Sequence, residues 1–99
     1  MAEFDLNLQS LLRFKLLSLL AAVTELEFAA LRDELRVSDS VLSKQVSALA
    51  GIDYVRSRKG VHAGRRTTWI SLTRTGRRAL TEHITALRDT ITRVDPHLR

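Results

Sequence analysis

The stretch Ser38-Asp-Ser-Val-Leu-Ser-Lys-Gln-Val-Ser-Ala-Leu-Ala50 has the pattern of an amphipathic helix with a capped start. Ser38 can accept a hydrogen bond from a free amide of the first turn, and Asp39 favours the positive end of the helix dipole. Three apolar side chains recur at helical spacing and predict one buried face: Leu42, Val46 and Leu49. The opposite face is made almost only of serine and lysine. We therefore predict a helix over residues 38–52 whose polar face is exposed.

The residues just before this stretch predict a second helix, over residues 27–36. Phe28, Leu31 and Leu35 form its inner face. Only Val37 separates it from the capping serine. Two short helices joined by such a tight turn form a helix-turn-helix.

A first helix is predicted over residues 7–22, capped by Asn7, after a loose terminus at residues 1–6. Its main apolar stripe consists of Leu12, Leu16, Leu19, Leu20 and Val23. A second apolar set lies on the opposite side and contains Leu11, Phe14, Leu17 and Ala21. A helix with two apolar faces is either buried on all sides or contacts a second partner. In so small a domain we favour a partner, and we predict a homodimer through Leu11, Phe14 and Leu17.

A β-hairpin is predicted over residues 54–72. The first strand alternates, with Val55 inward and Arg56 and Arg58 outward. Asp53 precedes the strand, at a position that requires a left-handed backbone and is most often glycine.

The returning strand is expected over residues 67–72 because its Thr-Thr-Trp-Ile-Ser-Leu sequence is rich in β-favouring residues. Glycines at 60 and 64 are expected to permit the sharp turn, which places Arg65 and Arg66 beside its tip. Trp69 lies on the face opposite Ile70, where it either covers the sheet or a partner helix, or contacts a ligand directly.

A last helix is predicted over residues 74–94, capped by Thr73 and ended by Pro96. Its apolar positions are spaced 4-3-4-3: Leu80, Ile84, Leu87, Ile91 and Val94. Such a narrow seam suits one partner helix. The seam either packs on the first helix of its own chain or, as we favour, contacts a second subunit through Leu87, Ile91 and Val94.

Positive charge is concentrated in one segment of this chain, whose net charge is +5. Residues 1–53 carry five basic and eight acidic side chains, and residues 79–99 carry three of each. Residues 54–78 carry eight basic side chains and no acid: Arg56, Arg58, Lys59, Arg65, Arg66, Arg74, Arg77 and Arg78. This distribution is typical of a surface that binds a polyanion, although a merely solvated basic face is the alternative.

Several classes of function are disfavoured by what the sequence lacks. The absence of cysteine excludes disulfides, iron–sulfur clusters, thiolate zinc sites and a cysteine nucleophile. His62, His83 and His97 are far apart, so we expect solvated histidines, no metal site and no cofactor. No phosphate-binding loop or hydrolase motif is present, and we expect no enzyme. The longest apolar run is too short to span a bilayer, and acids near the N-terminus disfavour a signal peptide, so we expect no membrane association and a cytoplasmic location.

The polar face of helix 38–52 and the basic hairpin together predict a binding site for DNA. Short or flexible side chains on this helix allow close approach to base edges: Ser38, Ser40, Val41, Ser43, Lys44 and Ser47. The hairpin adds Arg56, Arg58, Lys59, Arg65 and Arg66, which can clamp phosphate or enter a minor groove. The polar face of the helix could instead simply face water, and its side chains do not identify which bases would be contacted.

From Leu11 to Leu87 the chain resembles bacterial winged-helix transcriptional regulators of the MarR/ArsR-like kind. The residues that carry the resemblance run in order: Leu12-Arg-Phe-Lys-Leu-Leu-Ser-Leu-Leu20, Phe28-Ala-Ala-Leu-Arg-Asp-Glu-Leu35, Ser38 to Leu49, Tyr54-Val55, Arg65-Arg-Thr-Thr-Trp-Ile-Ser-Leu-Thr73 and Gly76-Arg-Arg-Ala-Leu80. The Leu-Thr-x-x-Gly passage is fairly specific in this context. The resemblance implies a homodimer, usually a repressor, on a pseudo-palindromic operator, with the third helix in the major groove and the hairpin as the wing.

This chain departs from the family in two places. Asp53 replaces a glycine that is common before the first wing strand, and the chain is shorter than full-length MarR members. A small-molecule effector is therefore left open.

We predict one α+β domain over residues 1–99: a winged helix, in which a three-helix helix-turn-helix bundle carries a two- or three-stranded β-wing, plus a long C-terminal helix. The predicted function is a double-stranded DNA-binding transcriptional regulator acting as a homodimer. The alternatives are a winged helix that binds another protein and a sequence-independent nucleic-acid binder.

Overall fold

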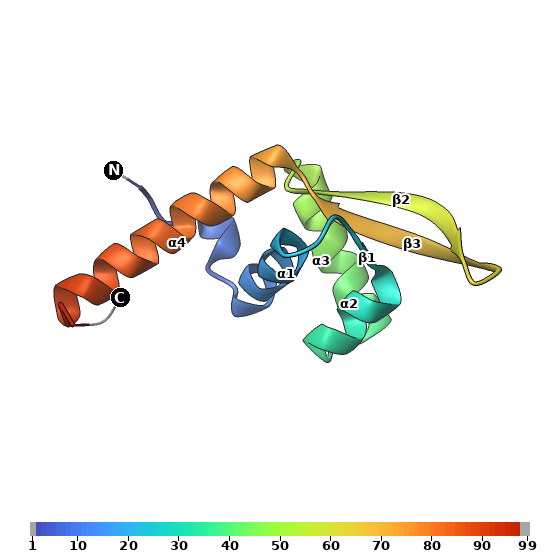
Figure 1. The fold of residues 1–99 in the computed structure, drawn as a ribbon, viewed down its shortest axis with the longest axis horizontal. Coiled ribbons are helices and arrows are strands. Elements are labelled where there is room, and N and C mark those ends of the chain that lie inside the picture. The colour runs from blue at the N-terminus through green and yellow to red at the C-terminus, as the bar shows by residue number, and fades with distance from the viewer. Residues whose placement is uncertain (1, 98–99) are drawn as a thin grey trace.

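The computed structural model describes residues 2–97. Its elements follow in the order η1 (Leu6–Leu8), α1 (Leu11–Ala21), β1 (Leu26–Glu27), α2 (Phe28–Leu35), α3 (Asp39–Gly51), β2 (Val55–His62), β3 (Arg65–Leu72) and α4 (Arg74–Val94). Figure 1 shows α1, α2 and α3 gathered beside the inner end of the sheet. The β2–β3 hairpin extends beyond them in one direction and α4 in the other. The molecule is therefore elongated, with extents of 51 × 23 × 22 Å.

The first helix begins later than its apolar pattern predicts. The expected start at Asn7 is wrong, because the amide of Asn7 donates to Asp5 Oδ1 at 2.8 Å and closes the short helix η1. The side chain of Ser10 then caps α1 by accepting from the Arg13 amide at 3.3 Å. Two capping side chains so close in sequence divide the predicted helix into two pieces.

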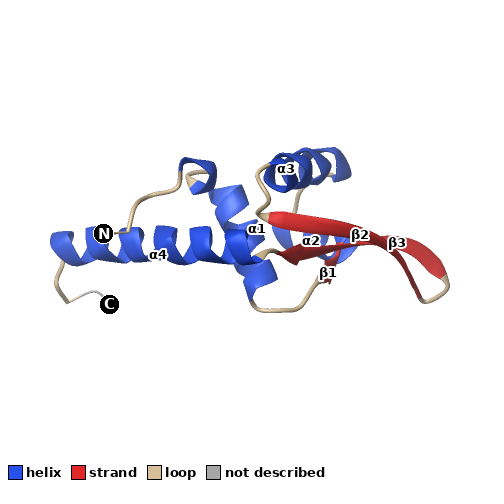
Figure 2. Cartoon of the chain, turned by 90° about the horizontal axis from the view of Figure 1, so that it is seen from above, coloured by secondary structure: helices blue, strands red, loops and turns tan. Residues whose placement is uncertain are grey.

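The sheet has three antiparallel strands in the order β1-β3-β2. Val55 pairs with Leu72 and Ser57 with Ile70, while Leu26 of β1 also pairs with Ile70. Side chains alternate along each strand, so these residues share one face. Val55 and Ile70 are buried. This face therefore packs against the helices: α1 and α2 contact β3, and α3 contacts β2. Figure 2 shows α3 lying beside β2.

The core consists of leucine, isoleucine and valine side chains from all the helices and the sheet. Its buried members are Leu8, Leu16, Leu17, Leu20, Leu31, Leu42, Val46, Leu49, Val55, Ile70 and Leu80. Leu17 was predicted to face a second subunit, but its exposed fraction is 0%. That prediction is wrong, because helix α1 lies between α2, the sheet and α4 and so buries residues on more than one side.

The N-terminal segment is held on the domain, so the predicted loose terminus at residues 1–6 is also wrong for the residues that the structure describes. The amide of Asp5 donates to His83 Nδ1 at 3.0 Å, and the hydroxyl of Tyr54 donates to the Asp5 carboxylate. His83 is only 3% exposed and its ring lies between Phe4 and Phe14, with centroid distances of 5.7 and 5.6 Å. It is a buried core histidine that joins the N-terminal segment to α4, where a solvated one was expected.

Tyr54 offers a direct test of this arrangement, because it is the only tyrosine in the chain. Burial, followed by the hydrogen bond to Asp5 and the charge of that carboxylate, raises the pKa of Tyr54 to about 12. We expect the tyrosinate absorbance to appear with a midpoint near this value, and Asp5→Asn to lower it. A raised pKa means that the folded state binds the phenolic proton of Tyr54 more tightly than the unfolded state does. The resulting contribution to stability is complete below pH 10 and is lost as the pH rises towards 12. A midpoint at the ordinary value of 10 in the folded protein would contradict the contact.

The junction between the sheet and α4 depends on Thr73 and Gly76. The Thr73 hydroxyl accepts from the Gly76 amide at 2.9 Å and donates to the carbonyl of Asp53. The Thr73 amide donates to the carbonyl of Tyr54 at 3.0 Å. A Cβ atom on Gly76 would overlap that carbonyl oxygen and lie 2.9 Å from Leu72 Cδ1. The close approach of α4 to the start of β2 therefore requires glycine here.

The C-terminal half of α4 extends past the rest of the domain (Figure 1). Leu87 is half-buried, whereas Ile91 and Val94 are 46% and 82% exposed. Within residues 2–97, none of the helices combines the length and the apolar character needed to cross a membrane.

Candidate nucleic-acid interface

Helix α3 presents a continuous polar face to solvent. Six residues were predicted for this face and all six are exposed: Ser38, Ser40, Val41, Ser43, Lys44 and Ser47. Leu42, Val46 and Leu49 are buried on the opposite side. The Ser38 oxygen accepts from the Val41 amide at 3.2 Å, so it caps the helix while its hydroxyl proton can still be donated.

The turn between α2 and α3 is fixed by its backbone and by charged side chains. Arg36 ends α2 in the left-handed conformation, with φ 56°. Arg32 donates to Asp33 at 3.0 Å and to Asp39 at 2.8 Å, which joins the end of α2 to the first turn of α3. These contacts orient the N-terminal end of α3.

Arg13 on α1 is a further positioning residue that sequence reasoning missed. Its Nε donates to Gln45 Oε1 at 2.7 Å and so joins α1 to the middle of α3. No helical spacing relates residues that are 32 apart in sequence. Only the packing of the two helices brings them together.

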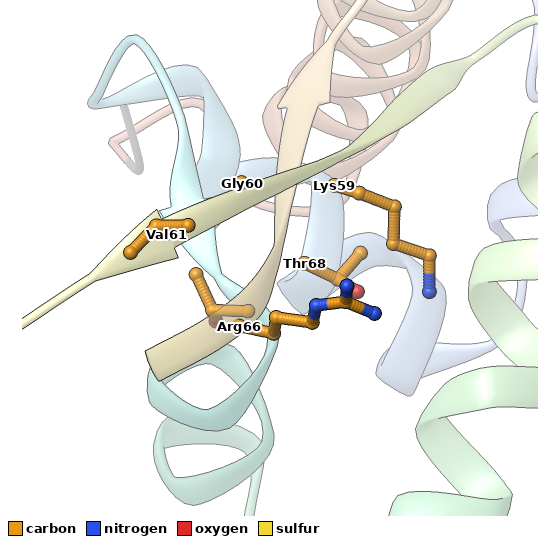
Figure 3. A pocket seen from close by; sticks show the side chains of 6 residues that line it. Lys59, Gly60, Val61, Arg66 and Thr68 are labelled. Carbon is orange, nitrogen blue, oxygen red and sulfur yellow. The ribbon is translucent and has the colours of Figure 1, made fainter. Parts of the chain in front are cut away.

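The basic hairpin has two chemically different faces, set by the register of β2 and β3. Lys59 pairs with Thr68 and Val61 with Arg66, and these four continue the face of Val55 and Ile70. Figure 3 shows the side chains of Lys59, Arg66 and Thr68 on the same side of the hairpin. The other face carries the remaining predicted wing cations: Arg56, Arg58 and Arg65.

On that other face Arg58 is already engaged. Its Nε donates to Glu25 at 3.0 Å, a second nitrogen pairs with the same carboxylate, and the guanidinium carbon lies 5.4 Å from the centroid of Trp69. His62 lies 3.3 Å from Glu27 and contacts Trp69 edge-on. Glu27 in β1 and Glu25, which directly precedes β1, therefore compensate part of the positive charge of the wing.

The turn at the tip differs from the expected one. Ala63 and Gly64 both have positive φ, 53° and 76°, as a two-residue type I′ hairpin requires. Gly60 is not in the turn. A Cβ there would lie 3.0 Å from the Trp69 ring and 2.8 Å from Arg58 Nη1, so this glycine leaves room for the indole. Asp53 has φ 62°, and the left-handed backbone predicted at this position is confirmed.

The basic run of residues 54–78 is therefore not one surface. Arg77 donates from both terminal nitrogens to the carbonyl of Ala21, at 3.3 and 3.4 Å, and so caps the C-terminal end of α1. Arg74 and Arg78 are exposed on the first turns of α4. The number of basic residues in this segment therefore exceeds the number available to a ligand, because some of the cations are engaged in contacts within the fold.

We expect Glu25→Gln to loosen the wing. The hydrogen bond from Arg58 lowers the pKa of Glu25 below its usual 4.5, so the pair is present at neutral pH and is lost as the pH falls through that lowered value. Trp69 is the only tryptophan, so its fluorescence reports on the wing. In the variant or in acid, the indole should become more accessible and a soluble quencher should reduce its fluorescence more strongly. Glu34→Gln, at an exposed position on α2, is the matched control. Equal quenching in all three proteins would contradict the anchoring role.

Comparison with known proteins places this geometry in a wider context. The sequence matches the model of the winged helix DNA-binding domain over residues 12–91. No curated protein matches it. The structure is similar to a transcriptional regulator homologue protein from Pyrococcus horikoshii OT3, with a TM-score of 0.84 and 20% identity over 90% of this chain and 88% of that chain.

Two longer proteins also share the fold. The zinc-responsive MarR family member ZitR of Lactococcus lactis has a TM-score of 0.67 and 22% identity over 97% of this chain and 65% of that one. The regulator MosR of Mycobacterium tuberculosis, solved in complex with DNA, has a TM-score of 0.69 and 21% identity over 87% and 61%. The chain thus spans less than two thirds of either. The predicted winged-helix fold is confirmed.

Proposed function

This chain belongs to the winged helix DNA-binding domain family, and on that basis we propose that it is a transcriptional regulator that binds double-stranded DNA. The observation that carries the proposal is the exposed serine and lysine face of α3 beside the wing. The face of the wing that continues from the buried Val55 and Ile70, called the helix-side face below, holds Lys59 and Arg66. In this proposal α3 lies in the major groove, where Lys44 and the serines contact base edges or phosphates. The basic side chains of the wing bind the backbone of the same duplex.

We further propose that the protein acts in the cytoplasm as a homodimeric repressor on a pseudo-palindromic site. Two observations support the dimer: Ile91 and Val94 are exposed on the projecting part of α4, and Leu11 is 65% exposed on α1. A two-fold dimer would present two α3 helices to half-sites one helical turn apart.

Selection of bound duplexes from a random pool tests this function most directly. We expect enrichment of one sequence that is related to itself by two-fold symmetry, and binding that weakens steeply as salt is raised. Equal affinity for every duplex would favour a sequence-independent binder. An absence of duplex binding, together with salt-insensitive binding to another protein, would favour an interaction module.

The dimer is tested by Ile91→Glu. We expect a monomer in sedimentation velocity, because a carboxylate in an apolar seam must be desolvated without a partner. Thr85→Glu, at an exposed position of the same helix outside the seam, should leave the sedimentation coefficient unchanged. If Ile91→Glu remains dimeric, the seam is not the interface and the exposed Leu11 of α1 becomes the position to test.

A further inference from the structure

We propose that Lys59, Arg66 and Thr68 form a phosphate site on the helix-side face of the wing, and that Arg58 on the other face positions the wing without contacting DNA. The inference rests on the proposed function and assigns different roles to basic residues that the sequence leaves equivalent. It follows from the strand register, from the ion pairs and from the placement of α3.

The helix-side face has the donors that a phosphate needs. Lys59 and Arg66 are exposed, and Thr68 lies opposite Lys59 in the register. These three side chains, with Gly60, Val61 and Thr67, line a shallow pocket of about 520 Å³ (Figure 3). None of the described residues that line it is acidic. An ammonium, a guanidinium fork and a hydroxyl can together donate to several oxygens of one phosphate group.

The opposite face is poorly suited to the same ligand. Glu25 and Glu27 lie on that side, where they are paired with Arg58 and His62, and Glu27 also accepts from Thr67. A backbone phosphate approaching there would meet two carboxylates. To use Arg58, it would also have to displace that side chain from Glu25 and from the Trp69 ring.

The position of α3 selects the helix-side face as well. Strand β2 lies at one edge of the sheet, and α3 packs against it. Val55, near the start of β2, is buried, and Lys59 continues the same face outward. A duplex lying on the exposed face of α3 therefore brings one strand past Lys59 and Arg66, while Arg58 is directed towards β1.

Single alanine variants test the assignment through the salt dependence of binding. The wild type is first titrated against the selected duplex at several salt concentrations. We expect Lys59→Ala and Arg66→Ala each to reduce the slope of log K against log salt by about 0.9, with a loss of affinity of about tenfold at 0.1 M salt. Thr68→Val should weaken binding with little change in slope, because it removes a neutral donor.

Lys15→Ala and Arg88→Ala remove the same charges from exposed positions on α1 and α4 and serve as matched controls. Arg56→Ala and Arg65→Ala compare the two faces of the wing, and each should change the slope by less than half as much as Arg66→Ala. If the slope falls equally for the alanine variants of Lys59, Arg66, Arg56 and Arg65, the inference is overturned and the proposed function still stands. A wild type that binds no duplex would overturn both. Unchanged Trp69 emission in each variant establishes that the wing is intact.

Discussion

Gly76→Ala is expected to destabilise this protein by about 2 kcal/mol or more, which corresponds to a fall of about 8 °C or more in Tm. The added methyl group would overlap the carbonyl oxygen of Tyr54. That carbonyl cannot move freely, because it accepts from the Thr73 amide at 3.0 Å. The loss therefore exceeds the advantage that alanine normally has over glycine within a helix. Thermal or denaturant unfolding measures it.

The same substitution elsewhere provides the control. At Gly51, the last residue of α3, an added Cβ meets no atom within 4 Å. We expect Gly51→Ala to stabilise the protein by roughly 0.5–1 kcal/mol, because alanine loses less backbone entropy on folding. If both variants were as stable as the wild type, the close approach of α4 to Tyr54 would not be as described.

Lys44→Glu should abolish most DNA binding, with a loss of affinity of about 100-fold or more at 0.1 M salt. Lys44 is exposed at the centre of the polar face of α3, and the change replaces a favourable contact with a like-charge repulsion against the duplex. Fluorescence anisotropy with the selected duplex measures the effect. The fold should be unaffected, since the side chain of Lys44 is exposed.

Lys15→Glu makes the identical change at an exposed position on α1 and separates local from global electrostatics. It should weaken binding much less than Lys44→Glu, because Lys15 lies on α1, outside the proposed DNA-binding face of α3, and salt screens exposed charges that are not in contact with the duplex. Equal losses in the two variants would mean that only net charge matters, and α3 would not then be the element that contacts DNA.

Local patterns predict most of this fold. The capped start of α3 and its stripe of Leu42, Val46 and Leu49 follow from hydrogen bonding and helical periodicity, which act over a few residues. Thr73 caps α4 and Asp53 adopts a left-handed backbone for equally local reasons. The candidate face of α3 could be identified for the same reason, because serine and lysine side chains opposite a buried apolar stripe favour solvent.

The burial of individual side chains depended on contacts between residues far apart in the sequence. Leu17 and Leu11 look equivalent in sequence, yet one is fully buried and the other is exposed, because burial depends on which elements surround α1. His83 is buried by Phe4 and Phe14, and its partner Asp5 is 78 residues away. No periodicity connects such positions.

The basic run shows the same division. The order of residues alone established that residues 54–78 carry eight cations and no acid, and so predicted a partner of opposite charge. Only the tertiary structure determined that Arg58 is paired with Glu25, that Arg77 caps α1, and that Lys59 and Arg66 share the face beside α3. A charge is a property of the residue, whereas its availability depends on neighbours that the fold brings from distant parts of the chain.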